Sequence, residues 1–131
     1  MMARAFRLAG ALLILVVVPS AQAADDGKEL VATWHNTSDG IAQYWTIKES
    51  KGAWTVEGIY KRGNQEIGSF QGKDPKFADG KLTFIQEFKV KPVASWDSGS
   101  TIVVAVQDGK LQFAWKNGLA MGKGVLELLK K

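Results

Sequence analysis

The sequence predicts an all-β protein, and within that class an eight-stranded antiparallel up-and-down β-barrel. Turn-forming pairs such as Asp39-Gly40 and Asp108-Gly109 recur at intervals of about 9 to 19 residues. The stretches between these pairs alternate apolar and polar residues, and none shows a long apolar pattern at helical spacing. Short strands joined by tight turns leave little room for crossover helices, so consecutive strands are expected to pair antiparallel.

Eight strands are expected, at residues 30–36, 41–49, 53–61, 65–72, 81–90, 100–107, 110–116 and 123–129. The pairs that separate them supply the positive φ that tight hairpins need. These pairs are Asp39-Gly40, Lys51-Gly52, Gly63-Asn64, Asp79-Gly80, Ser98-Gly99, Asp108-Gly109 and Asn117-Gly118. The last range has an alternative interpretation as a helix, because Leu126, Leu128 and Leu129 lie close together before the terminal lysines.

Alternation gives each strand one buried and one wet face. The expected buried faces carry Trp54, Val56, Gly58 and Tyr60 in the third strand, Leu82, Phe84 and Phe88 in the fifth, and Leu111, Phe113 and Trp115 in the seventh. A closed barrel uses this pattern and leaves no exposed edge. A two-sheet β-sandwich is the alternative.

The sixth strand is apolar on both faces, although a barrel has only one interior. Either Thr101, Val103 and Ala105 or Ile102, Val104 and Val106 must therefore face outward. We expect a second copy of the chain to cover that outward face, in a homo-oligomer.

The first 23 residues have the pattern of a cleaved signal peptide. Arg4 and Arg7 precede an uncharged apolar run at 8–18, and Ala21-Gln22-Ala23 is a small-x-small cleavage site. The run is too short to cross about 30 Å of hydrocarbon as a helix. We therefore expect a single barrel domain at 24–131 that is secreted or periplasmic, with no membrane span after cleavage.

Composition excludes several classes of function. The chain has 17 basic and 13 acidic residues, one His and no Cys, so disulfides, thiolate metal sites and a Cys nucleophile are excluded. Loss of Arg4 and Arg7 lowers the formal charge from +4 to +2, which gives no reason to expect a nucleic-acid partner. We expect a protein that is not an enzyme and needs no metal or cofactor. The catalytic alternative combines His35 with Glu57 or Glu87.

Aromatic residues are the unusual feature. Five tryptophans follow the signal peptide: Trp34, Trp45, Trp54, Trp96 and Trp115. The interior of an eight-stranded barrel is either filled or holds one small ligand. Aromatic walls with a few inward polar groups are typical of a ligand cavity. The candidate polar groups are Asn36, Tyr60, Gln86 and Ser69.

Several motifs occur in the order found in the avidin and streptavidin family. The segment Ala32-Thr33-Trp34-His35-Asn36 resembles the opening strand of that family, and Gly58-Ile59-Tyr60 and Phe113-Ala114-Trp115 resemble later strands. A Trp in the first strand is also typical of lipocalins, which share the calycin type of barrel. The chain departs from the avidin pattern at Ala32, where the family has Gly, and at 124–126, where no acidic residue occurs.

This resemblance implies a calycin-type barrel with ligand contacts at Asn36, Tyr60, Trp96 and Trp115. Together with Trp34 these residues form the predicted ligand-binding site. We therefore expect an exported barrel that binds a small, partly apolar molecule through aromatics lining its interior. The alternative is an extracytoplasmic protein–protein interaction module, or inhibitor, with a filled barrel. An interior cavity of about 300 Å³ or more favours the first.

Overall fold

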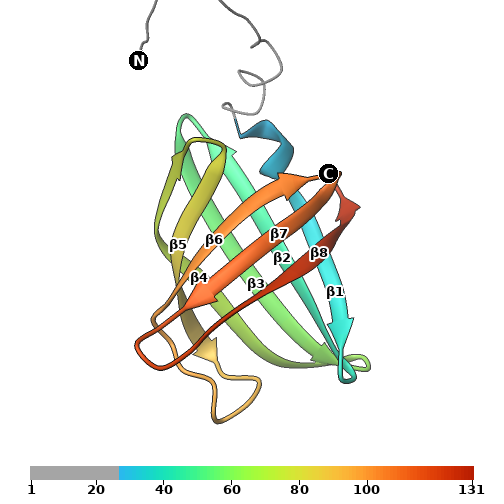
Figure 1. The fold of residues 1–131 in the computed structure, drawn as a ribbon. Coiled ribbons are helices and arrows are strands. Elements are labelled where there is room, and N and C mark those ends of the chain that lie inside the picture. The colour runs from blue at the N-terminus through green and yellow to red at the C-terminus, as the bar shows by residue number, and fades with distance from the viewer. Residues whose placement is uncertain (1–26) are drawn as a thin grey trace, which may run out of the picture.

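The computed structural model describes residues 27–131, so the signal peptide expected at 1–23 lies outside the described residues. A 3-10 helix, η2 (Lys28–Leu30), precedes eight strands. The strands are β1 (Ala32–Ser38), β2 (Ile41–Ser50), β3 (Ala53–Arg62), β4 (Gln65–Ala78), β5 (Lys81–Val90), β6 (Ser100–Gln107), β7 (Lys110–Lys116) and β8 (Met121–Lys130). Each pairs antiparallel with the next, and β8 pairs with β1 to close the barrel (Figure 1). The predicted up-and-down barrel is confirmed, and the sandwich is excluded.

Several strand bounds differ from those predicted, and the largest differences are in β4 and β1. The strand β4 continues to Ala78 through an irregularity between Lys73 and Lys76. The strand β1 begins only at Ala32, because η2 occupies the residues before it. The segment Met121–Lys130 is a strand, so its interpretation as a helix was wrong. Within residues 27–131 no helix has the length and apolar character needed to cross a membrane.

The hairpin turns explain why consecutive strands pair. In four of the predicted pairs both residues have φ between 52° and 83°, as in the two-residue hairpins that match strand twist. These four are Asp39-Gly40, Lys51-Gly52, Asp79-Gly80 and Asp108-Gly109. The connection from β5 to β6 is longer, over residues 91–99. It lies at the end of the barrel opposite η2, which we call the open end (Figure 1).

The end beside η2, which we call the closed end, is filled with apolar side chains. The Trp34 indole is 2 % exposed, and its Nε1 donates to the carbonyl oxygen of Leu30 at 3.0 Å, which fastens η2 across this end. The aliphatic residues packed there are at most 1 % exposed: Leu30, Ile47, Val56, Leu82, Val104, Leu111 and Leu126. The closed end therefore has an apolar core from which solvent is excluded.

Aromatic rings occupy the middle of the barrel. The Trp45 ring lies 4.9 Å from Phe113 and 5.3 Å from Phe70, measured between ring centroids. Two of these rings lie over glycines of neighbouring strands: a Cβ at Gly124 would be 2.6 Å from Phe113, and a Cβ at Gly58 would collide with the Phe70 ring. The rings therefore fit because those positions lack a side chain.

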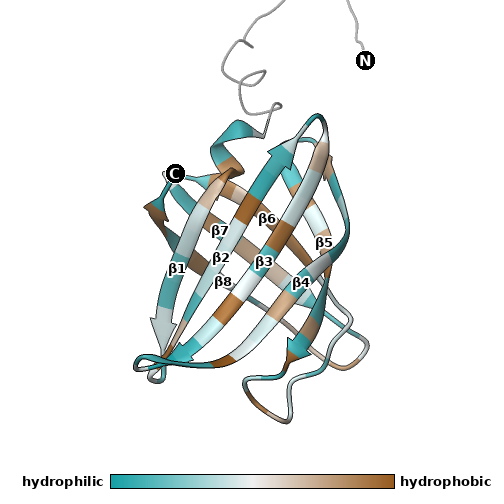
Figure 2. Cartoon of the chain, turned by 180° about the vertical axis from the view of Figure 1, so that it is seen from behind, coloured by the Kyte–Doolittle hydropathy of each residue, from teal (hydrophilic) through white to brown (hydrophobic). Residues whose placement is uncertain are grey.

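The outer wall follows the predicted alternation (Figure 2). In β6, Ile102 and Val104 are buried inside, whereas Thr101, Val103 and Ala105 face outward and are half-buried. The outward set predicted for an oligomer contact is therefore the one containing Val103. The oligomer itself stays a prediction, and light scattering of a Val103→Lys variant tests it.

Candidate functional site: a cavity at the open end

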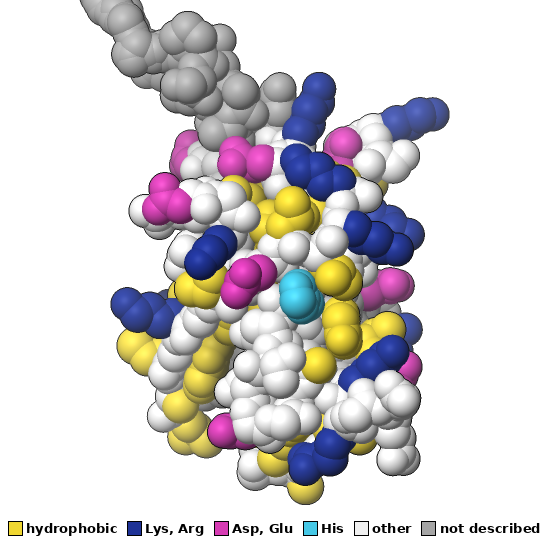
Figure 3. Space-filling view, turned by 90° about the vertical axis from the view of Figure 1, so that its right-hand side faces the viewer, with side chains coloured by type: hydrophobic (Ala, Val, Ile, Leu, Met, Phe, Trp, Pro, Cys, Tyr) yellow, Lys and Arg dark blue, Asp and Glu magenta, His cyan; other side chains and the backbone are white. Residues whose placement is uncertain are grey.

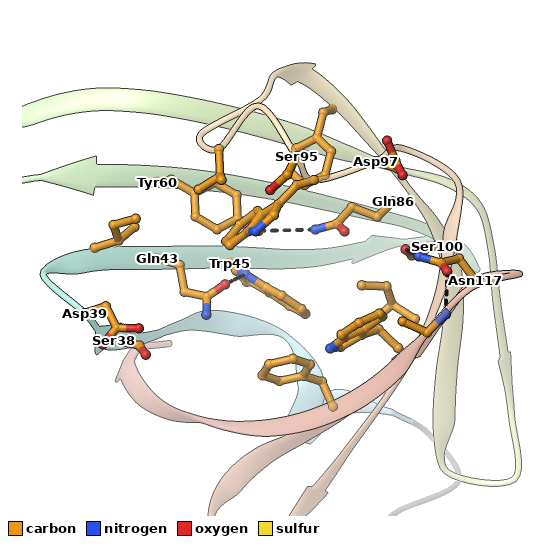
Figure 4. Close-up of a pocket in the computed structure, with 18 of the residues that line it drawn as sticks. Ser38, Asp39, Gln43, Trp45, Tyr60, Gln86, Ser95, Asp97, Ser100 and Asn117 are labelled. Carbon is orange, nitrogen blue, oxygen red and sulfur yellow. Dashed lines mark hydrogen bonds between the residues drawn. The ribbon is translucent and has the colours of Figure 1, made fainter.

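A cavity of about 720 Å³ opens at the end of the barrel opposite η2 (Figure 4). Six aromatic residues line it: Trp45, Tyr60, Phe88, Trp96, Phe113 and Trp115. The polar residues that line it are Ser38, Asp39, Gln43, Gln86, Ser95, Asp97, Ser100 and Asn117. The open end therefore combines aromatic walls with polar groups, in contrast to the closed end.

The Trp45 ring is fixed by a chain of hydrogen bonds. Its Nε1 donates to Gln43 Oε1 at 2.8 Å, and Gln43 Nε2 donates to Asn36 Oδ1 at 2.9 Å. Asn36 Nδ2 in turn donates to the Val125 carbonyl at 3.0 Å, which links β1 to β8. Because the indole N–H is already hydrogen-bonded to Gln43, Trp45 provides the cavity with an apolar ring surface and not with a hydrogen-bond donor.

Two buried polar side chains meet across the cavity from β3 and β5. Gln86 Nε2 donates to the Tyr60 hydroxyl at 3.2 Å, and the two residues are 8 % and 3 % exposed. Burial raises the pKa of Tyr60 well above its usual range, and the weaker opposing effect of the Gln86 hydrogen bond does not cancel that rise. Tyr60 therefore remains a neutral hydroxyl at neutral pH.

A second polar pair joins β6 to the β7–β8 connection. Asn117 Nδ2 donates to Ser100 Oγ at 3.3 Å, and Ser100 is 5 % exposed. Asn117 Oδ1 accepts from the backbone N–H groups of Leu119 and Ala120, which shapes the connection. Asn117 thus holds the loop and also presents its amide beside the cavity.

The β5–β6 connection covers part of the cavity. The Trp96 ring contacts Tyr60 edge-on, with centroids 5.6 Å apart, and lies 6.2 Å from Phe88. The C-terminal end of this connection is hydrogen-bonded to β5, because Phe88 N donates to Ser98 Oγ and Gly99 N donates to the Gln86 carbonyl, each at 2.8 Å. Trp96 remains 40 % exposed and therefore forms part of the rim.

The structure brings three of the five predicted site residues to the cavity. Tyr60, Trp96 and Trp115 line it. Trp34 does not, because its indole reaches toward η2 at the closed end. Asn36 does not line it either, but it holds Gln43, which does.

The further polar candidates divide in the same way. Gln86 lines the cavity as expected from its inward position. Ser69 was expected to point inward, and this was wrong. It lies in register with Ile59 and Val90, which are 38 % and 56 % exposed, and its neighbour Phe70 fills the inward position.

Sequence reasoning missed several lining residues. Gln43 and Trp45 alternate along β2 and could have been found from that period. Ser100 and Asn117 lie beside turns, where turn-forming chemistry accounts for such residues equally well. They lie opposite each other at the end of the β6–β7 hairpin, and alternation alone does not show that their side chains form a hydrogen bond.

The residues of the catalytic alternative lie on the outer wall and not in the cavity. His35 stacks on Tyr44 with ring centroids 6.2 Å apart, and its register neighbour on β8 is Glu127. Glu57 and Glu87 both lie beside Gln71 of β4, on opposite sides. Over residues 27–131 no group of three or more His, Asp or Glu side chains could hold a metal ion. Acidic and basic groups are interspersed on the outer wall, with the histidine among them (Figure 3).

Comparison with known proteins gives no match, whether with family models, curated proteins or solved structures. The structure itself shows a closed, eight-stranded antiparallel up-and-down barrel, which is consistent with a calycin-like fold.

Proposed function

We propose that this chain is an exported protein that binds a small, partly apolar molecule at the open end of the barrel. The observation that carries the proposal is the cavity of about 720 Å³, which has aromatic walls and the buried Tyr60–Gln86 pair. Ligand sites generally combine apolar walls with a few polar groups that fix orientation.

The cavity volume favours ligand binding over an interaction module with a filled barrel. It exceeds the roughly 300 Å³ at which small-molecule sites begin. Biotin is not the proposed ligand, because the segment 124–126 lacks the acidic residue of the avidin pattern.

The two tyrosines of the chain provide a matched test. Tyr60 lines the cavity, whereas Tyr44 lies on the outer wall against His35. Titration with small neutral ring compounds, followed by intrinsic Trp fluorescence, should give saturable binding. Tyr60→Phe should weaken it by about 1–3 kcal/mol if the hydroxyl bonds the ligand. Tyr44→Phe should leave it unchanged, and equal losses in both variants would contradict the proposal.

Export is tested separately. Protein made in an exporting host should begin near Ala24 by intact mass and be found in the soluble extracytoplasmic fraction. A product that retains residues 1–23 in the membrane would overturn this part of the proposal.

A further inference from the structure

The cavity lining has an unusual charge composition. Among the described residues that line it, none is Lys, Arg or His, although the chain has 17 Lys and Arg residues against 13 Asp and Glu. The charged residues of the lining are two carboxylates, Asp39 and Asp97. Asp97 also lies 3.8 Å from the Lys91 ammonium, in a pair that is exposed to solvent. Basic side chains are therefore absent from the described lining, although the chain has more basic than acidic residues.

The buried polar groups of the cavity are neutral and are not fully used by the protein. The Tyr60 and Ser100 hydroxyls act as acceptors in the Gln86 and Asn117 hydrogen bonds. Within residues 27–131 no hydrogen bond uses Gln86 Oε1. Gln86 is 8 % exposed, and a buried acceptor without a partner costs about 1–3 kcal/mol. Gln86 Oε1 is therefore available to accept a hydrogen bond from an N–H or O–H group of a molecule in the cavity.

An anion would be poorly accommodated in these surroundings. It would lose its hydration on entering, and the lining has no cation to compensate for that loss. Aromatic rings line the cavity, and the face of such a ring attracts positive charge and repels negative charge. Asp39 adds repulsion at the mouth. All three effects disfavour an anion, and none of them disfavours a neutral or cationic molecule.

We infer that the cavity selects its ligand by charge: it takes an uncharged or cationic ring compound that donates a hydrogen bond to Gln86, and it rejects carboxylates, sulfonates and phosphates. This inference rests on the proposed function. It narrows the class of ligand from any partly apolar molecule to one without negative charge.

Two fluorescent probes with the same ring system test this directly. N-phenyl-1-naphthylamine is neutral and has one N–H donor, and 1-anilinonaphthalene-8-sulfonate adds a sulfonate to it. The neutral probe should bind at least about 10-fold more tightly to the full barrel. Equal or tighter binding of the sulfonate would overturn the charge inference and leave the proposed function standing. Failure of both probes to bind would overturn the proposed function as well.

A pair of charge variants shows whether the preference arises in the cavity. Ser95 lines the cavity beside Tyr60 (Figure 4), whereas Gln112 lies on β7 between the inward Leu111 and Phe113 and faces outward. Ser95→Lys and Gln112→Lys add the same charge to the protein. Ser95→Lys should reduce the preference for the neutral probe by at least about threefold, and Gln112→Lys should leave it unchanged. An equal change in both variants would mean that net charge sets the preference, and would overturn the inference.

Discussion

The two ends of this barrel are built on the same strands but contain different chemistry. A step of four residues along a strand keeps a side chain on the inner face and moves it from the closed end to the open end. The step exchanges Ile47 for Gln43 in β2, Val56 for Tyr60 in β3, and Leu82 for Gln86 in β5. Each exchange replaces an aliphatic group by one that can form a hydrogen bond.

The comparison teaches that stability and binding are separated along the barrel axis. The closed end buries aliphatic groups completely, and such burial contributes about 25 cal/mol per Å² of apolar surface. The open end leaves space and keeps polar groups, which contribute less to stability but can recognise a ligand. Substitutions at the two ends should therefore have different effects.

The largest expected effect is at Trp34. Trp34→Ala should lower the free energy of unfolding by about 3–5 kcal/mol, because it empties the closed end and removes the hydrogen bond to Leu30. Urea denaturation measures this loss. The folded fraction should keep its affinity for N-phenyl-1-naphthylamine.

Trp115→Ala is the matched variant at the open end, where the half-buried indole lines the cavity. It should cost less stability and more affinity, and the reverse order would break the comparison.

An intermediate effect is expected at Gly58, between the two ends. Gly58→Ala should lower the free energy of unfolding by about 1–3 kcal/mol, because the added methyl group collides with the Phe70 ring. Gly118→Ala is the control, because a Cβ at Gly118 meets no atom within 4 Å. Thermal unfolding of both variants checks the difference. Equal melting temperatures would contradict the packing of Phe70 over β3.

The smallest expected effect is the pH dependence of the buried hydroxyl. The raised pKa of Tyr60 means that above pH of about 10 the unfolded chain ionises this group while the folded barrel does not. The stability that the neutral Tyr60 hydroxyl contributes is therefore fully present below about pH 10. Above that pH the free energy of unfolding falls by up to about 1.4 kcal/mol per pH unit. Urea unfolding between pH 9 and 11 (an approximate range that brackets the usual tyrosine pKa) measures the slope.

Tyr60→Phe should remove this part of the slope, and Tyr44→Phe should preserve it. Because other ionisable groups also contribute to the slope, the result is the difference in slope between each variant and the parent protein. A slope that Tyr60→Phe leaves unchanged would contradict the burial of the hydroxyl.

The fold was predictable because its determinants are local. Turn pairs such as Asp79-Gly80 determine where each hairpin turns. The alternation of apolar and polar residues determines which side chains point inward, and it correctly predicted that Tyr60 and Gln86 are inside. Alternation gives the face of a residue but not its depth along the barrel axis. Trp34 was therefore expected in the site although it fills the closed end.

The rest of the site depends on which polar side chains form hydrogen bonds across paired strands, which neither turn pairs nor alternation specify. The Ser100–Asn117 hydrogen bond crosses the end of the β6–β7 hairpin, and the hydrogen bonds from Trp45 through Gln43 and Asn36 reach β8. The error at Ser69 has a different cause. Alternation continues through this part of β4, with Gly68 and Phe70 buried, so it places Ser69 between them on the outer face once Phe70 is assigned to the core.

The packing of Phe70 over Gly58 also constrains how this sequence can change over generations. A side chain at position 58 and the ring at position 70 would occupy the same space, so the two positions are coupled. Enlarging position 58 alone overpacks that space, and shrinking position 70 alone leaves a cavity, so each single change lowers stability. Descendants of this chain should therefore change both positions or keep both. The same coupling should hold for Phe113 and Gly124 on β7 and β8.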